Sequence, residues 1–214
     1  MTNRDFDKLA ETLMSEFPIF ARHKKLLYLP LENGLLRGIL FDSSDFSKTK
    51  FYVYAFLMPL FVPSKNLTLS FGDRLRVDKK FDCWDLNNAD TAAKLRNAIE
   101  TQGLPFLNSL GTVTDFISYL RDKGPMTHSL EALAYSLAWE GLALEAASVF
   151  DQIPPRLEPN IPWQKELRDR AIECATQLLS TPVLAIDHLK DVESTTRNNL
   201  GLPQRKAHTC STPS

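Results

Sequence analysis

The chain has 214 residues, of which 43% are hydrophobic and 24% charged, and its formal net charge at pH 7 is −1. This length and composition support a hydrophobic core without disulfide staples and exclude a wholly disordered chain. The balanced charge excludes a global basic field of the kind that recruits nucleic acid or anionic lipid. Neither a nucleic acid nor a membrane is therefore the expected partner.

Cysteine usage and the N-terminal segment indicate the cytoplasm. Cys83, Cys174 and Cys210 are odd in number and far apart, which fits unpaired thiols in a reducing compartment. Acidic residues interrupt the apolar positions of the first thirty residues, so no signal peptide is predicted. No apolar run reaches the roughly 18 residues that a membrane-spanning helix needs. We expect a soluble cytoplasmic protein.

An amphipathic helix opens the chain. Its apolar residues recur at helical spacing and form one continuous stripe: Phe6, Leu9, Ala10, Leu13, Met14 and Phe17. Thr2 or Asn3 can cap this helix, and Pro18 ends it because the residue before a proline avoids the α conformation. Such a stripe must be buried against an apolar surface.

A β-hairpin is predicted next. Asn33-Gly34 indicates a type I′ turn between strands at 26–32 and 35–41, since both central residues tolerate a positive φ. The turn sets three cross-strand pairs on one face, Leu31 with Leu36, Leu29 with Gly38 and Leu27 with Leu40. It also places Pro30, which has no N–H, at a hydrogen-bonded position. Either the first strand is an edge strand or it bulges at Pro30, and the edge is favoured.

Two further strands complete the predicted sheet. Residues 50–62 are apolar on both parities and rich in aromatic side chains, which is typical of a central strand buried on both faces. Leu67, Leu69 and Phe71 alternate with polar residues and predict a half-buried last strand that ends at Gly72. One helix can cover only one face of the central strand, so we expect the helical half to cover the other.

From Asp90 onward the apolar residues follow a helical period. Helix boundaries are expected at Gly103 and Pro105, Gly124-Pro125, Pro154-Pro155 and Thr181-Pro182. The predicted fold class is α+β, with an N-terminal helix on a four-stranded antiparallel meander followed by an all-helical C-terminal half. We divide the chain into 1–88, 89–200 and a flexible tail at 201–214.

Residues 128–153 are compatible with a single tetratricopeptide-type hairpin, because small residues and an aromatic recur around Gly141. Such repeats build peptide-binding grooves when three or more stack. The sequence contains only one such unit, and that unit lacks the full tetratricopeptide pattern. An ordinary helical hairpin is therefore the favoured interpretation.

A candidate binding corner follows the last predicted strand. Asp73, Arg74 and Arg76, together with Arg37, place a carboxylate and three guanidiniums near strand ends, where arginine can hold a phosphate or carboxylate bidentately. The competing interpretation is a strand exit in which Asp73 and Arg74 pair locally, and it is favoured because structural ion pairs are common.

No catalytic, metal-binding or phosphate-binding motif is found in the sequence, and no cofactor is predicted. The four histidines lie too far apart for metal-ligand spacing. His23 belongs to the basic cluster Arg22-His23-Lys24-Lys25, which could contact phosphate but is more typical of a solvated connection. Cys83 lies between Asp82 and Asp85, whose charges disfavour a thiolate.

One resemblance concerns about a third of the chain. It lies in Leu35–Ile39, Phe51–Val53, Met58–Pro63 and Phe71–Leu75. These stretches resemble a group of bacterial domains of unknown function, some of which occur near contact-dependent toxin systems and are regarded as immunity proteins. The resemblance implies a helix paired with a small antiparallel sheet, and it carries no catalytic residue.

Three functional hypotheses follow. The leading one is a non-catalytic bacterial protein that binds another protein, as an immunity or accessory factor. The second is an enzyme of unrecognised type, with a cleft between the sheet and the helices that uses Arg37, Asp73, Arg74 or His23. Nucleic-acid binding is the third and least favoured, because it needs a clustered basic face.

Overall fold

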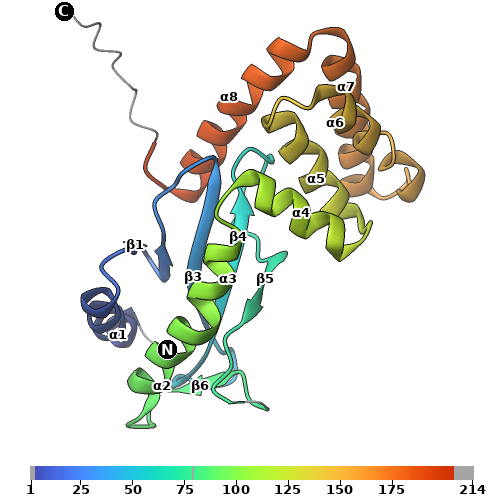
Figure 1. Ribbon diagram of the computed structural model, residues 1–214. Coiled ribbons are helices and arrows are strands. Elements are labelled where there is room, and N and C mark those ends of the chain that lie inside the picture. Colours follow the sequence, from blue (N-terminus) through green and yellow to red (C-terminus); the bar gives the residue numbers. More distant parts are fainter. Residues whose placement is uncertain (1–2, 79, 205–214) are drawn as a thin grey trace, which may run out of the picture.

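A helix, an antiparallel sheet and a helical C-terminal half make up the α+β fold of the computed structural model, as the sequence predicts (Figure 1). The structure describes residues 3–78 and 80–204. The sheet occupies one end of the molecule and the bundle of α4 to α8 the other (Figure 1).

Six strands are found in the described part of the chain: β1 (Ala21–His23), β2 (Leu26–Tyr28), β3 (Leu35–Ser43), β4 (Lys50–Pro59), β5 (Phe71–Arg74) and β6 (Cys83–Asp85). They are antiparallel in the order β1-β2-β3-β4-β5. β6 pairs with the start of β4, at Lys50 to Tyr52, while β5 pairs with a later part of the same strand. The meander of four strands is therefore present, and the short strands β1 and β6 extend it at two places that the sequence does not signal.

Helix α1 (Asn3–Glu16) lies on one face of the sheet, which we call the first face (Figure 1). The predicted stripe is buried except for Met14, which is partly buried, and the Phe6 ring packs on Phe41 of β3 with 5.1 Å between centroids. The same face receives α2 (Thr91–Ala98) and its continuation, whose Leu95 and Ile99 are fully buried beside Val53. The first face is thus covered by the N-terminal helix and by the first helix of the rear half.

The hairpin turn at Asn33-Gly34 forms with positive φ at both residues, as predicted, but the predicted register is wrong by one residue. Leu27 pairs with Ile39 rather than with Leu40. β2 ends at Tyr28, short of the predicted strand end at residue 32, and Leu29 N makes a last cross-strand bond to Arg37 O at 2.9 Å. Pro30 lies beyond the ladder, where its carbonyl accepts from Glu32 N at 2.9 Å, so the N–H that it lacks is not needed. The preference for an edge strand is also wrong, because β1 pairs with β2 on its outer side.

The central position of β4 is confirmed, since it pairs with β3 on one side and with β5 and β6 on the other. Its second face is covered in a different way from the first. Phe56 and Met58 pack with Leu36 of β3, with the loop that carries Leu67 and Leu69, and with Leu202 after the last helix. The predicted strand from Leu67 to Gly72 is therefore mostly a covering loop, and β5 begins only at Phe71.

The first rear helix passes through its predicted end. Instead of stopping at Gly103 and Pro105, α2 continues as a π turn (Ile99–Gly103) into α3 (Leu104–Ser109). In the π turn Leu104 N donates to Ile99 O five residues back. This wider turn accommodates the proline ring, which would clash in a regular helix, and Pro105 needs no partner for an N–H it lacks.

The remaining helices are α4 (Val113–Lys123), α5 (Thr127–Trp139), α6 (Ala143–Phe150), α7 (Pro162–Ser180) and α8 (Pro182–Leu200), with a 3₁₀ turn at Pro154–Arg156. The α5–α6 hairpin turns at Gly141, where φ is +81°. It packs between α4 and α7. Its core also takes in Leu57 and Phe61 from the sheet, so the two halves of the chain share one hydrophobic core.

The packed part of the chain extends into the predicted tail. Leu202 is 5% exposed, and Gln204 hydrogen-bonds to Ser194 and Asn198 of α8. Residues 201–204 are thus part of the fold. The rest of the predicted tail, with Cys210, lies outside the described residues.

Candidate functional site

The predicted binding corner is a local network. Arg74 lies over the Tyr52 ring at 4.1 Å from its centroid, and it donates to Tyr54 Oη at 2.8 Å and to Asp82 Oδ2 at 2.9 Å. The bonds to Asp82 and Tyr54 raise the pKa of Arg74, so its charge is fixed, and they engage its Nε and Nη1. The predicted local pair with Asp73 is replaced by one with Asp82, eight residues on.

Arg37 serves a different part of the fold. Its guanidinium Nη1 donates to Leu107 O at 3.0 Å, near the end of α3. Burial lowers the pKa of Arg37, against the opposing effect of the Glu32 and Asp115 carboxylates. An arginine that satisfies a helix-terminal carbonyl anchors α3 to the sheet, which is a structural role.

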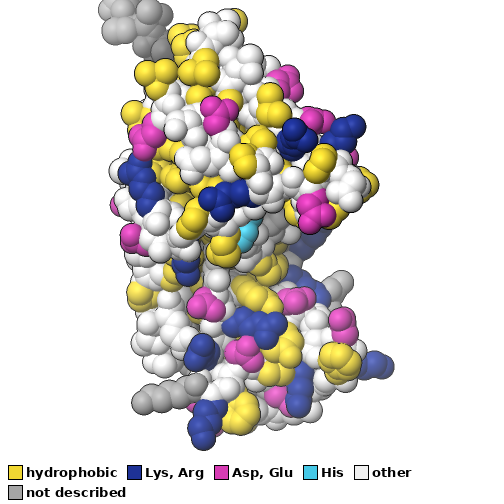
Figure 2. Space-filling model, turned by 90° about the vertical axis from the view of Figure 1, so that its right-hand side faces the viewer, with side chains coloured by type: hydrophobic (Ala, Val, Ile, Leu, Met, Phe, Trp, Pro, Cys, Tyr) yellow, Lys and Arg dark blue, Asp and Glu magenta, His cyan; other side chains and the backbone are white. Residues whose placement is uncertain are grey.

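The four predicted residues do not converge on one site. Asp73 accepts a hydrogen bond from Arg74 N, and the backbone of Arg76 exchanges hydrogen bonds with the Gln102 side chain of the π turn. A small hollow of about 130 Å³ lies between the sheet and α5, but its lining includes none of these residues, nor Arg37 or His23. Figure 2 shows a face with a hollow between the two halves, on which basic and acidic side chains are interspersed.

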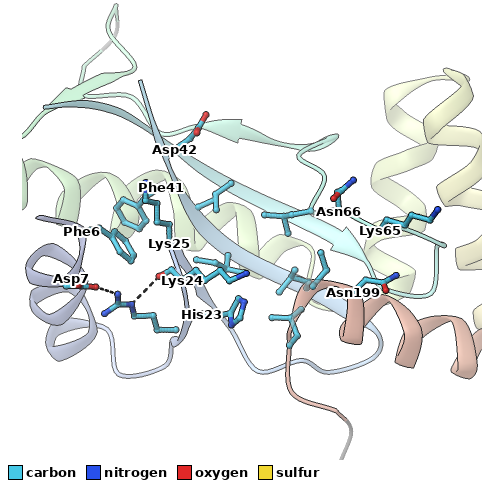
Figure 3. Close-up of a pocket in the computed structure, with 17 residues that line it drawn as sticks. Phe6, Asp7, His23, Lys24, Lys25, Phe41, Asp42, Lys65, Asn66 and Asn199 are labelled. Atoms are coloured by element: carbon cyan, nitrogen blue, oxygen red, sulfur yellow. Dashed lines mark hydrogen bonds and ion pairs between the residues drawn. The ribbon is translucent and has the colours of Figure 1, made fainter. Parts of the chain in front are cut away.

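A larger hollow lies on the second face of the sheet. It has a volume of about 840 Å³, and we call it the basic groove (Figure 3). Its polar rim consists of Arg22, His23, Lys24, Lys25, Lys65, Asn66 and Asn199, with Asp7 and Asp42 as its two carboxylates. Its apolar floor consists of Leu26, Leu36, Leu40, Leu67, Leu200 and Leu202, flanked by the two aromatic residues Phe6 and Phe41.

Three distant segments build the basic groove. The turn between β1 and β2 supplies His23 to Lys25, the loop after β4 supplies Lys65 and Asn66, and the end of α8 supplies Asn199 (Figure 3). Asn199 Nδ2 donates to Ser64 O at 3.0 Å, which ties α8 to the loop. This bond fixes the side of the groove that the loop and α8 form together.

Lys24 occupies a strained backbone position. His23 pairs with Leu26, so the turn has two central residues, and Lys24 takes a φ of +52° there. This conformation costs a residue with a side chain about 1 kcal/mol or more. Arg22 Nε donates to Lys24 O at 3.2 Å and supports the turn. A glycine would adopt this backbone conformation without strain, so a lysine here lowers the stability of the fold relative to a glycine.

Some charged side chains of the rim have a hydrogen-bond or ion-pair partner and others form no ion pair. Arg22 pairs with Asp7, and Lys25 Nζ donates to Ser43 Oγ at 2.6 Å. Lys24 and Lys65 form no ion pair with any residue in the described ranges. Two ammonium groups are therefore available to a ligand on opposite sides of an apolar floor.

His23 is packed at the end of the groove near Gly201. A Cβ placed on Gly201 would lie 3.2 Å from His23 Cε1 and 3.4 Å from its Nε2, so the glycine admits the imidazole ring. The Nε2 atom is buried and has no hydrogen-bond partner within residues 3–78 and 80–204. His23 adds a polar atom beside the leucine floor.

Sequence reasoning singled out the cluster Arg22 to Lys25 but interpreted it as a solvated connection. The other contributors, Lys65 and Asn199, carry no local signal. The groove exists because the loop after β4 and the end of α8 meet over the same face of the sheet (Figure 1).

No group of three or more histidine, cysteine or acidic side chains in the described ranges could hold a metal ion. None of the described helices is long and apolar enough to cross a membrane. No protein-family model matches the chain, and neither the curated proteins nor the solved structures provide a match.

Proposed function

We propose that this chain is a non-catalytic protein-binding factor, as an immunity or accessory protein of a bacterial cell, and that it binds an acidic segment of its partner in the basic groove. The observation that carries the proposal is that Lys24 and Lys65, which line the basic groove from two different segments, form no ion pair with any described residue.

The shape of the groove favours a segment of polypeptide. Leu40, Leu67 and Leu200 are the partly exposed leucines of the floor, and they offer apolar area whose burial would contribute to the free energy of binding. The lysines at the rim select carboxylates and increase the rate of encounter. The chemistry that matches both is an extended segment in which leucine-like residues alternate with aspartate or glutamate.

Binding selection from a random peptide library tests this proposal. We expect the folded protein to enrich peptides that combine Asp or Glu with Leu, Ile or Val. The double variant Lys24→Glu/Lys65→Glu should lose this enrichment, because both free charges of the rim are reversed. The matched control is Lys48→Glu/Lys80→Glu, which makes the same charge change at exposed positions outside the groove. An enrichment without acidic residues, or one that survives the groove variant, would contradict the proposal.

The alternative of an enzyme with a cleft between the halves gains no support from the geometry. Its candidate groups Arg37, Asp73 and Arg74 bind backbone or neighbouring side chains at separate places, and of the four only His23 lines the basic groove. Convergence of polar groups on one hollow is what an active site requires.

A further inference from the structure

The basic groove contains one carboxylate that has no cation beside it. Its two acidic side chains are Asp7 of α1 and Asp42 of β3. Asp7 pairs with Arg22. Asp42 is exposed and forms no ion pair with any residue in the described ranges. Its negative charge is therefore available to a ligand, as the positive charges of the two unpaired lysines are.

Cations of the neighbouring segments are engaged with other groups. Lys25 Nζ, in the turn before β2, donates to Ser43 Oγ at 2.6 Å. Arg74, two strands away from Asp42 on β5, pairs with Asp82 at 2.9 Å. A ligand that brings a cation to Asp42 would thus add an ion pair without breaking one.

Asp42 and Lys65 lie toward opposite ends of the basic groove (Figure 3). Leu36 and Asp42 are an even number of residues apart on β3, so both face the second side of the sheet. Leu36 belongs to the cluster on which Leu67 packs, and Leu67 follows Lys65 in the covering loop. From Leu36 to Asp42 the strand measures about 20 Å. The groove therefore has a free cation near one end of this strip and a free anion at the other.

We infer that the segment bound in the basic groove carries charges of both signs: an acidic residue at Lys65 and, about six residues away in an extended chain, a basic residue at Asp42. The inference rests on the proposed function and names the charge pattern of the partner segment. A segment that is acidic throughout would place a carboxylate beside Asp42, where like charges repel. Opposite charges at the two ends also fix the register of the segment on the leucine floor.

Fluorescence anisotropy with labelled Glu–Leu repeats of about eight residues tests the inference on the full chain. The first and last glutamates of such a repeat are about 20 Å apart when it is extended, which matches the strip from Leu36 to Asp42. Two further peptides replace either the first or the last glutamate by lysine. We expect one of them to bind about fivefold more tightly than the unmodified repeat, because repulsion at Asp42 becomes attraction, and the other about fivefold less tightly, because it loses the carboxylate at Lys65.

Substitutions of Asp42 assign the gain to this side chain. Asp42→Asn should abolish the gain and keep the loss seen at the other end of the repeat. Asp42→Lys should invert the preference, so that the unmodified repeat binds more tightly than either lysine peptide. The matched control Asp45→Asn changes an exposed carboxylate in the loop after β3, outside the groove, and should preserve the gain.

The outcomes separate the two proposals. A lysine that weakens binding at both ends of the repeat, or a gain that persists in Asp42→Asn, would overturn the inference and leave a groove that selects acidic residues along its whole length. Absence of binding by all three peptides would instead contradict the proposed function, and with it the inference that rests on it.

Discussion

Arg197 and Glu193 lie one turn apart on α8 and form an ion pair of 2.6 Å, with 3% and 2% of their side chains exposed. The remaining guanidinium bonds join separate parts of the chain. Arg197 donates to Pro203 O at 3.1 Å and to Leu31 O, in the segment before the hairpin turn, at 3.2 Å. The pair therefore fixes the end of α8 and the segment that carries Leu202 against the sheet, where they form part of the groove floor.

Removal of this arginine should be costly. Arg197→Met removes the guanidinium that pairs with the buried Glu193 carboxylate, and we expect the free energy of unfolding to fall by about 3–5 kcal/mol. Urea denaturation measures this change. The control Arg121→Met breaks an exposed pair with Glu145 and should change the free energy by less than about 1 kcal/mol. Equal effects of the two substitutions would show that the buried pair does not hold the fold together.

Gly38 provides a test of the observed hairpin register. A Cβ at Gly38 would lie 2.5 Å from Leu27 O, a backbone atom of the neighbouring strand. Gly38→Ala must therefore push β2 and β3 apart, at an expected cost of about 1–3 kcal/mol in unfolding free energy. Gly111→Ala, where the nearest atom would be 3.5 Å away, is the matched control and should be close to neutral. A neutral Gly38→Ala would contradict the pairing of Leu27 with Ile39.

The chemistry of Cys174 gives a prediction about pH. Burial raises the pKa of the Cys174 thiol, which outweighs the opposing effects of the Tyr135 hydroxyl at 3.4 Å and of Arg170. The thiolate is the reactive form, and a raised pKa lowers its fraction at neutral pH. Alkylation by iodoacetamide, followed by peptide mass spectrometry, should be slow at pH 7 and should accelerate only above the usual pKa of a cysteine. In urea, where burial is lost, the same residue should react at the rate of a free thiol. Rapid alkylation of the folded protein at pH 7 would contradict this assignment.

Salt should weaken binding in the basic groove without abolishing it. The charges of Lys24 and Lys65 are screened over about 10 Å at 0.1 M salt, whereas contacts with the leucine floor are not. A Glu–Leu repeat of about eight residues should therefore lose affinity as sodium chloride increases and then reach a plateau. The Lys24→Glu/Lys65→Glu variant should lack the salt-weakened component. A salt response identical in the two proteins would place the charged contacts outside the groove.

Local chemistry explains which parts of the fold the sequence predicts. The turn at Asn33-Gly34 depends on the φ preferences of two residues, and the first helix depends on a stripe of uniform spacing, so both can be derived from short segments. The register of the hairpin depends on how the chain avoids placing Pro30 in the ladder. An edge strand and a bulge are both compatible with the local sequence. The pairing of β1 with β2, which excludes the edge, can be seen only in the tertiary structure.

The same limit applies to the first rear helix and to the groove. Gly103 and Pro105 are typical of a helix end, yet packing on the sheet overrides them. A Cβ on Gly103 would lie 3.2 Å from Ile39 Cδ1, so the glycine allows close approach of the helix to β3. The basic groove combines residues about 40 and 130 positions apart in sequence, and only the fold brings Lys24, Lys65 and Asn199 together.

Hydrogen exchange of the full chain, with and without a Glu–Leu repeat of about eight residues, tests the central claim most directly. We predict slower exchange of backbone amides in the turn between β1 and β2, around Lys24, and in the loop around Lys65. The strand end at Arg74 lies outside the groove and serves as an internal reference. Slower exchange at Arg74 with no change at Lys24 and Lys65 would contradict the assignment of the basic groove as the binding site.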